Sequence, residues 1–191
     1  MKLIGSGTSP YVRRTRLLLG DRPYEFESLD IYGADRDALR ARNPALKIPM
    51  LVDGGRTLYD SRVIARYLSD KFEHAPLSWD QENLLTLVDA ANDSMVALVL
   101  SHKSGLDIHD GATFHELQHE RIARAMTALE DVAADGAFDA WDYPAICVYC
   151  LVDWAEMREM FDFAEHAALR GVRERHRGQP MVAETDPRRA G

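Results

Sequence analysis

The sequence predicts two parts of different fold class, an α/β domain over residues 1–76 and an all-α domain over residues 77–191. In the first part, short runs with strand character alternate with amphipathic stretches. From Trp79 onward, apolar residues recur only at helical spacing. The link Glu73-His74-Ala75-Pro76 interrupts the pattern between the two parts, since proline cannot continue a helix.

The first domain is expected to follow the order strand, helix, strand, helix, strand, strand, helix. Leu3-Ile4 predicts the first strand, and Ser9-Pro10 predicts a helix start, because serine is a common N-cap and proline suits the first helical position. The remaining expected elements are a strand at residues 24–29, a short helix at 35–42, a hairpin turning at Asp53-Gly54-Gly55, and a helix carrying Val63, Ile64, Tyr67, Leu68 and Phe72.

The second domain is expected to contain two amphipathic helices and one helix buried at its centre. The run at residues 144–160 is apolar on nearly all sides, which is typical of a central helix. The segment after Gly178 is expected to be a coil. The predicted apolar stripes are Leu84, Leu87, Val88, Ala91, Met95, Leu98 and Val99 in one helix, and Phe114, Leu117, Ile122, Ala125, Met126 and Leu129 in the other.

Charge and composition narrow the classes of function that this sequence can have. The 191 residues are 46% hydrophobic, which is ample for a core, and the net charge of −8 disfavours a general nucleic-acid binder. Residues 1–76 carry 13 Lys and Arg against 10 Asp and Glu, so a basic first domain suits an anionic ligand. Apolar runs are short and there are only two cysteines, so we expect a soluble cytoplasmic protein with no membrane span.

The stretch from Asn43 to Ser61 carries the strongest functional signal. Pro49 precedes the apolar run Met50-Leu51-Val52, and a proline at that place holds Ile48 extended. The main-chain N–H and C=O of Ile48 are therefore expected to remain available, at a sheet edge, to pair with a peptide-like ligand.

Asp60 and Ser61 stand where the third helix of the first domain is expected to begin. We expect Ser61 to cap that helix, and the helix N-terminus then attracts a carboxylate. Asp60 beside it suits an amine. Together these features fit a zwitterionic γ-glutamyl peptide, although an ordinary hairpin followed by a well-capped helix would show the same residues.

The motif Asn43-Pro44-x-x-Lys47-Ile48-Pro49, followed by Asp60-Ser61, resembles the glutathione site of the glutathione S-transferase family. The resemblance implies a thioredoxin-like first domain, a helical second domain, a homodimer and glutathione as co-substrate. It further implies a cis Pro49, an Ile48 that pairs with the cysteinyl backbone, and an Asp60-Ser61 pair that holds the γ-glutamyl group. Lys47 is either the partner of the glycine carboxylate or a solvated side chain at a loop tip.

Ser9 is the predicted catalytic residue. Thr8-Ser9-Pro10-Tyr11-Val12 resembles the serine-type members of the family, in which a hydroxyl touches the glutathione sulfur. A hydrogen bond to a thiolate contributes about 1.5–3 kcal/mol and a helix N-terminus about 0.3–1 kcal/mol. Together they would lower the pKa of a thiol from ~8.5 by about one to three units. Ser9 serving only as a cap, and Thr8 serving as the thiol partner, remain open alternatives.

Other features of the sequence also bear on its function. The Arg13, Arg14 and Arg16 run follows the expected helix start and could bias the local electrostatic potential, but a solvated helix face is the more usual interpretation. Since no cysteine stands beside Ser9, addition or substitution at an electrophilic carbon is favoured over disulfide exchange. The resemblance places the second substrate between the two domains, with Tyr11, Met95, Leu98 and His102 as candidate contacts.

His115-Glu116-Leu117-Gln118-His119 matches the H-E-x-x-H pattern of zinc hydrolases, but it lies beside the apolar stripe, which favours a solvated helix face. Cys147 and Cys150 are interpreted as core residues. Asp142 is expected to cap the buried helix.

The sequence therefore favours a glutathione S-transferase that attacks a small electrophile. A non-catalytic binding or regulatory protein on the same scaffold is the alternative, and a zinc hydrolase that uses His115 and His119 is the third possibility.

Overall fold

The computed structural model describes residues 1–189, which form two compact units. The first contains Met1–Pro76 together with residues 177–189, and the second contains Leu77–His176. The expected limit after residue 76 coincides with this division, whereas residues 177–189 group with the first unit rather than with the helices that precede them.

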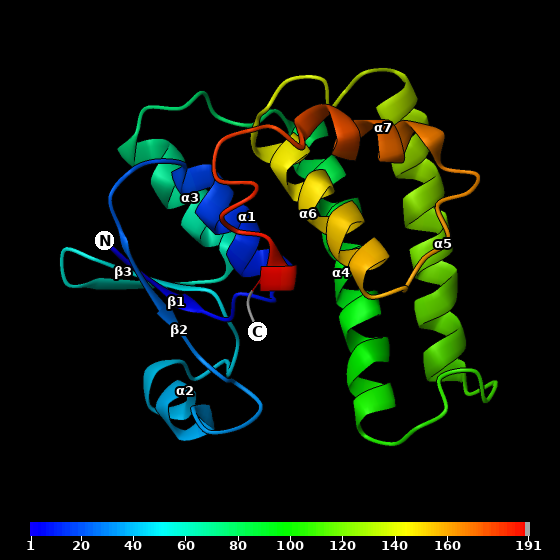
Figure 1. The fold of residues 1–191 in the computed structure, drawn as a ribbon, viewed down its shortest axis with the longest axis horizontal. Coiled ribbons are helices and arrows are strands. Elements are labelled where there is room, and N and C mark those ends of the chain that lie inside the picture. Colours follow the sequence, from blue (N-terminus) through cyan, green and yellow to red (C-terminus); the bar gives the residue numbers. More distant parts are fainter. Residues whose placement is uncertain (190–191) are drawn as a thin grey trace. The chain divides into compact units, whose positions relative to one another are not determined.

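The first unit is a four-stranded mixed sheet with three helices, as predicted (Figure 1). The sheet order is β2-β1-β3-β4, with β1 and β2 parallel and the other neighbours antiparallel. Its elements are β1 (Lys2–Gly5), α1 (Pro10–Leu19), β2 (Glu25–Ser28), α2 (Arg36–Arg42), β3 (Met50–Asp53), β4 (Arg56–Tyr59) and α3 (Ser61–Lys71).

Two local features set the geometry of this sheet. Gly54 and Gly55 both have positive φ, 55° and 79°, which suits the two-residue turn between β3 and β4. A Cβ on Gly5 would lie 2.4 Å from Cγ2 of Val12, so glycine is needed there for α1 to pack closely on the end of β1. Figure 1 shows α1 and α3 on one side of the sheet and α2 on the other.

The second unit consists of four helices: α4 (Trp79–Lys103), α5 (Thr113–Ala134), α6 (Tyr143–Met157) and α7 (Ala167–His176). Every residue of α6 from Tyr143 to Ala155 is buried, which confirms the predicted central helix. Cys147 and Cys150 are buried thiols in that helix, as expected of core residues. The Asp142 side chain accepts a hydrogen bond from the Ala145 N–H at 3.0 Å, so its predicted role as a cap is also confirmed.

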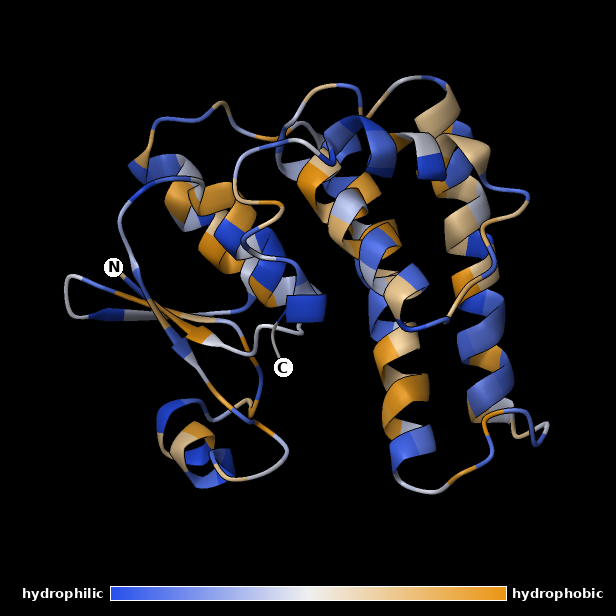
Figure 2. Cartoon of the chain, viewed as in Figure 1, coloured by the Kyte–Doolittle hydropathy of each residue, from blue (hydrophilic) through white to orange (hydrophobic). Residues whose placement is uncertain are grey.

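The N-terminal turns of α5 differ from the prediction. Phe114 and Leu117 are 54% and 47% exposed, and the buried face there belongs to His115 and Gln118. The predicted stripe is confirmed only from Ile122 onward, because hydrogen-bonded polar side chains replace apolar ones in the first turns. Figure 2 shows hydrophobic and hydrophilic residues alternating around this helix.

Helix α4 is long and apolar enough to cross a membrane by length and composition. The expectation of no membrane span rests on the short uncharged apolar runs of the sequence and stays a prediction. The same properties are found in core helices of soluble proteins. In this structure α4 begins with a capping box formed by Ser78 and Gln81 and contacts α5 and α6.

Helix α7 is capped by a side chain from another helix. The two carboxylate oxygens of Glu130, in α5, accept hydrogen bonds from the N–H groups of Ala168 and Leu169 at 2.7 and 2.9 Å. A carboxylate at this position satisfies two N–H groups that lack partners within the helix and opposes the positive end of the helix dipole.

Glu130→Ala should therefore lower the free energy of unfolding by about 1–2 kcal/mol. Urea denaturation followed by circular dichroism measures this. Glu120→Ala is the matched control on the same helix, since Glu120 is exposed and pairs with Arg124 one turn later; its cost should stay below about 0.5 kcal/mol. Equal losses in the two variants would contradict the capping role.

Candidate functional site

Ser9 lies at the junction of the first strand and the first helix. It is the N-cap of α1, and its Oγ accepts a hydrogen bond from the Val12 N–H at 3.4 Å. The Ser9 N–H donates to the Ser6 carbonyl at 3.1 Å, which closes the loop between β1 and α1. The Thr8 hydroxyl is 3.1 Å from the Ser6 hydroxyl. Ser9 is half-buried and capping is confirmed, while its predicted contact with sulfur stays a prediction.

The loop before Pro49 is shaped by a buried asparagine. The Asn43 Nδ2 donates to the Lys47 carbonyl at 2.7 Å, and its Oδ1 accepts from the Ala45 N–H at 2.9 Å. Asn43 is 1% exposed, so the side chain forms the interior of the loop. The Ile48-Pro49 peptide bond is cis, as the family resemblance implied.

The main-chain N–H and C=O of Ile48 take no part in the sheet. Among residues 1–189, no hydrogen bond reaches the N–H or C=O of Ile48. Its side chain packs against the cluster of Ile4, Leu39 and Met50, which holds the residue in place. The prediction of a sheet edge is wrong, because β3 lies between β1 and β4 and Ile48 precedes the first residue of that inner strand.

The start of α3 differs by one residue from the prediction. Asp60 is the N-cap, and its Oδ1 accepts from the N–H groups of Arg62 and Val63 at 2.7 and 3.4 Å. Ser61 is the first residue of the helix and is buried, so the prediction that Ser61 caps it is wrong. Asp60 has a φ of 71°, uncommon for a residue other than glycine and often associated with functional sites.

Arg14 is buried against Ser61, a contact that the sequence does not reveal, although the arginine run was considered as a possible influence on the local potential. Its Nε and Nη2 both donate to the Ser61 hydroxyl, at 3.0 and 2.6 Å, and its guanidinium lies 5.0 Å from the centre of the Tyr11 ring. Since the hydroxyl oxygen accepts from the guanidinium, Ser61 can contribute to an anion only through its hydrogen. Arg14 therefore adds positive charge at the start of α3 and orients the Ser61 hydroxyl so that its O–H points away from the guanidinium.

The interpretation of the arginine run as a solvated face is wrong. Arg13 and Arg14 are each 3% exposed, and Arg16 is half-buried with its Nε donating to the Tyr24 hydroxyl at 3.1 Å. The three-residue spacing of Tyr11 and Arg14, which puts them on one helix face, was a signal that could have indicated a buried guanidinium.

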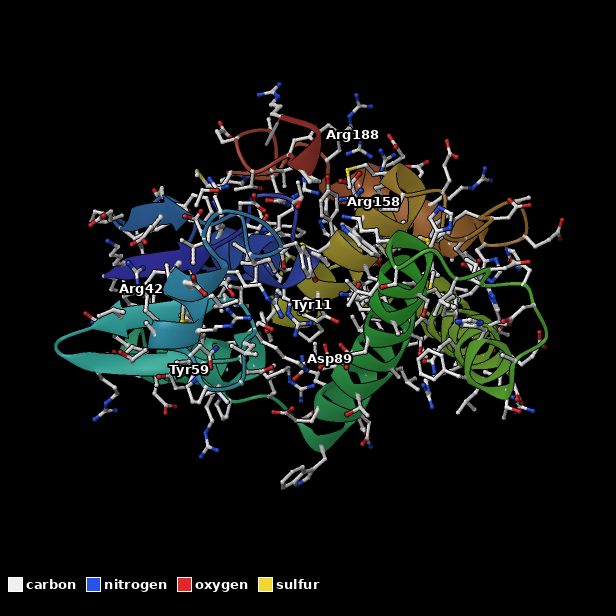
Figure 3. All side chains as sticks on the ribbon, turned by 90° about the horizontal axis from the view of Figure 1, so that it is seen from below. Tyr11, Arg42, Tyr59, Asp89, Arg158 and Arg188 are labelled. Carbon is white, nitrogen blue, oxygen red and sulfur yellow. The ribbon has the colours of Figure 1, made fainter. Side chains whose placement is uncertain are left out.

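One hydrogen bond joins the loop before Pro49 to the start of α3. The Tyr59 hydroxyl, next to Asp60, donates to the carbonyl of Arg42, next to Asn43, at 3.0 Å. Tyr59 and Arg42 are labelled in Figure 3. The two segments predicted to bind opposite parts of a peptide ligand are therefore held to each other.

The other predicted binding residues vary in exposure. Lys47 is exposed at the loop tip, Tyr11 is half-buried and His102 is exposed near the end of α4. Met95 and Leu98 are buried. Their assignment to a ligand or second substrate stays a prediction.

The H-E-x-x-H histidines hold the loop that precedes α5. His115 is 4% exposed and its Nδ1 lies 2.9 Å from Asp110 Oδ1, while His119 Nε2 lies 3.0 Å from the Ile108 carbonyl. The hydrogen bond with His115 holds the pKa of Asp110 below its ordinary value. The prediction of a solvated face is therefore wrong for His115. Within residues 1–189, no group of three or more His, Cys, Asp or Glu is arranged to hold a metal ion.

Comparison with known proteins agrees with this architecture of a mixed sheet followed by a helical unit. Residues 3–76 match the family described as "Glutathione S-transferase, N-terminal domain". The chain is 30% identical over 172 residues to the uncharacterized GST-like protein YibF of Escherichia coli strain K12, and the alignment covers 84% of both proteins. The chain belongs to the glutathione S-transferase family.

Two solved structures have the same fold. A glutathione transferase family member from Pseudomonas fluorescens Pf-5, crystallised with bound glutathione, has a TM-score of 0.81 and 27% identity over 97% of this chain and 98% of that one. A glutathione S-transferase from Methylobacillus flagellatus with glutathione bound has a TM-score of 0.84 at 22% identity, with the same coverage. A thioredoxin-like unit followed by a helical unit is therefore the fold of this chain.

Proposed function

We propose that this protein is a glutathione S-transferase that binds glutathione as its co-substrate and activates the thiolate for attack on a small electrophile. The observation that carries the proposal is the available main chain of Ile48, in the unit that also holds Ser9 and the Arg14–Ser61 pair. The 27% identical structure with bound glutathione supports it.

Each end of the tripeptide has a chemically suitable partner. The cysteinyl backbone pairs with the N–H and C=O of Ile48, ahead of Pro49. The γ-glutamyl carboxylate meets the Ser61 hydroxyl and the N-terminus of α3, with Arg14 behind the hydroxyl. The γ-glutamyl amine meets the exposed carboxylate of Asp60, and Lys47 pairs with the glycine carboxylate.

The chemistry follows from the position of Ser9. Its O–H donates to the thiolate while its oxygen retains the long contact with the Val12 N–H, so capping and thiolate stabilisation coexist. The sulfur lone pair then forms a bond to an electrophilic carbon, and the leaving group departs with its electron pair or the adduct takes a proton from water. Both cysteines of the chain are buried in α6, so neither serves in this step.

We also propose a cytoplasmic homodimer. Phe114 and Leu117 are exposed apolar side chains three residues apart on α5, and contiguous exposed apolar surface is typical of a face that a partner covers. Sedimentation equilibrium should give twice the chain mass. A single-chain mass at every concentration would rule out the dimer and leave the binding proposal standing.

Ser9→Ala should raise the pKa of the bound glutathione thiol by about one to two units, because a hydrogen bond to the charged form is lost. The ultraviolet absorbance of the thiolate, titrated against pH at saturating glutathione, measures this pKa. Thr8→Val is the comparison variant and should leave the pKa unchanged. The reverse pattern would assign the role to Thr8.

The same titration separates the two functional hypotheses. A transferase shows a thiolate signal and conjugates a generic aromatic halide at neutral pH, and both fall in Ser9→Ala because the thiol pKa rises. A non-catalytic binding protein retains glutathione without either property.

The Arg14–Ser61 pair predicts a coupled loss of affinity. Arg14→Met and Ser61→Ala should each weaken glutathione binding about tenfold or more, and the double variant should be no weaker than the worse single one. Isothermal titration measures these affinities. Arg16→Met is the control on the same helix and should stay within about twofold.

A glutathione analogue without the γ-glutamyl carboxylate should bind parent and Arg14→Met equally. Equal weakening for glutathione and the analogue would show that Arg14 does not act on that carboxylate.

A further inference from the structure

Arg13 is a buried charge on α1 that the proposed binding site does not use. It is 3% exposed, its Nη2 donates to the Val182 carbonyl at 3.1 Å, and its Nε donates to the Thr185 hydroxyl at 3.4 Å. These partners lie 169 and 172 positions later in the chain. Because burying a guanidinium is costly unless its donors are satisfied, α1 and this C-terminal segment depend on each other.

The C-terminal segment is folded where it meets α1. The Thr185 hydroxyl accepts from Arg13 and donates to the Met181 carbonyl at 2.7 Å, and the Thr185 N–H donates to the same carbonyl at 3.0 Å. Val182, Thr185 and Pro187 are all buried. The expectation of a coil is wrong for the end of the segment, because residues 181–185 form a tight turn around the Arg13 side chain and Pro187–Arg189 form a 3-10 helix.

Electrostatics agree with this arrangement. Burial alone would raise the pKa of Asp186, yet hydrogen bonds from Arg188 and the nearby charge of Arg13 hold it below its ordinary value. Asp186 therefore remains ionised within the folded segment. Figure 1 shows the segment passing beside α1 and ending in the short helix η1 (Pro187–Arg189).

Arg13 is also one helical turn from Ser9. The Arg13 N–H donates to the Ser9 carbonyl at 3.0 Å. The Val12 N–H, one residue earlier in the same helical turn, donates to the Ser9 hydroxyl. Any displacement of Arg13 therefore reaches Ser9 through the first turn of the helix. The turn is further fixed by the close approach of Val12 to Gly5.

We infer that residues 177–189 form a C-terminal clamp that positions Ser9, with Arg13 and Thr185 as the positioning residues. The inference rests on the proposed function of Ser9 as the hydroxyl that meets the glutathione sulfur. The clamp has two separable consequences, one for the order of the first turn of α1 and one for the pKa of the bound thiol.

The first consequence is measured on the full chain without ligand. Hydrogen exchange at the amides of Val12 and Arg13 should become about tenfold faster in Arg13→Met and in Thr185→Val, because each change removes a hydrogen bond of the clamp. Arg13→Lys retains the charge and should show a smaller increase. Arg189→Ala alters an exposed arginine of the same segment and should leave the exchange unchanged.

The second consequence is measured with glutathione bound. Thr185→Val should raise the pKa of the bound thiol, as judged from the thiolate absorbance, so that the thiolate fraction at neutral pH falls about threefold or more. In the Ser9→Ala background the same change should have no further effect. A general loss of stability would raise the thiol pKa whether or not Ser9 is present, so the dependence on Ser9 distinguishes positioning from destabilisation.

The outcomes are distinct. Unchanged exchange in both clamp variants overturns the inference whether or not glutathione binds. Faster exchange with an unchanged thiol pKa, or an equal rise of that pKa in the Ser9→Ala background, shows that the clamp stabilises α1 without positioning Ser9, and also overturns it. If the unmodified protein binds no glutathione, the proposed function and the role of Ser9 are both refuted. The hydrogen-exchange data would still show whether the C-terminal clamp orders the first turn of α1.

Discussion

The Arg14 guanidinium lies buried beside the first residue of α3, with two of its nitrogens donating to the Ser61 hydroxyl. This contact fixes α1 against α3, and α1 carries Ser9 at its N-terminus. The relation between the proposed carboxylate site at Ser61 and the proposed thiol site at Ser9 is therefore set by one helix and its buried arginines. Two charged side chains replace apolar ones on α1, so the helix depends on its hydrogen-bond partners more than an ordinary core helix would.

Around this contact, the loop between α2 and β3 supplies the third part of the proposed site. Asn43 organises the loop that leads to Ile48, and Tyr59 connects that loop to the residue before Asp60. The parts that would meet the cysteinyl and γ-glutamyl groups are thus joined by hydrogen bonds. Preorganisation of this kind lowers the entropy lost when a flexible tripeptide is bound.

The elements of the first unit, the helices α4, α5 and α6 and the loop before Pro49 were predictable from sequence, because proline, glycine and the hydrophobic period act locally; α7 was not among the expected helices. Arg13 and Arg14 were not, since their partners are 172 and 47 positions away and an arginine run reads locally as a solvated face. The shift of the α3 cap from Ser61 to Asp60 depends on a positive φ that the sequence does not show. Phe114 and Leu117 were misassigned because hydrogen bonds to a loop bury the neighbouring polar residues instead.

The central claim is that a tripeptide thiol is held by the main chain of Ile48, with its acidic end at Ser61 and its sulfur at Ser9. A crystal structure of the protein grown with glutathione tests this most directly. The account predicts main-chain hydrogen bonds between the cysteinyl residue and Ile48, and a sulfur within hydrogen-bonding distance of the Ser9 hydroxyl. Glutathione bound elsewhere, or a sulfur remote from Ser9, would contradict it.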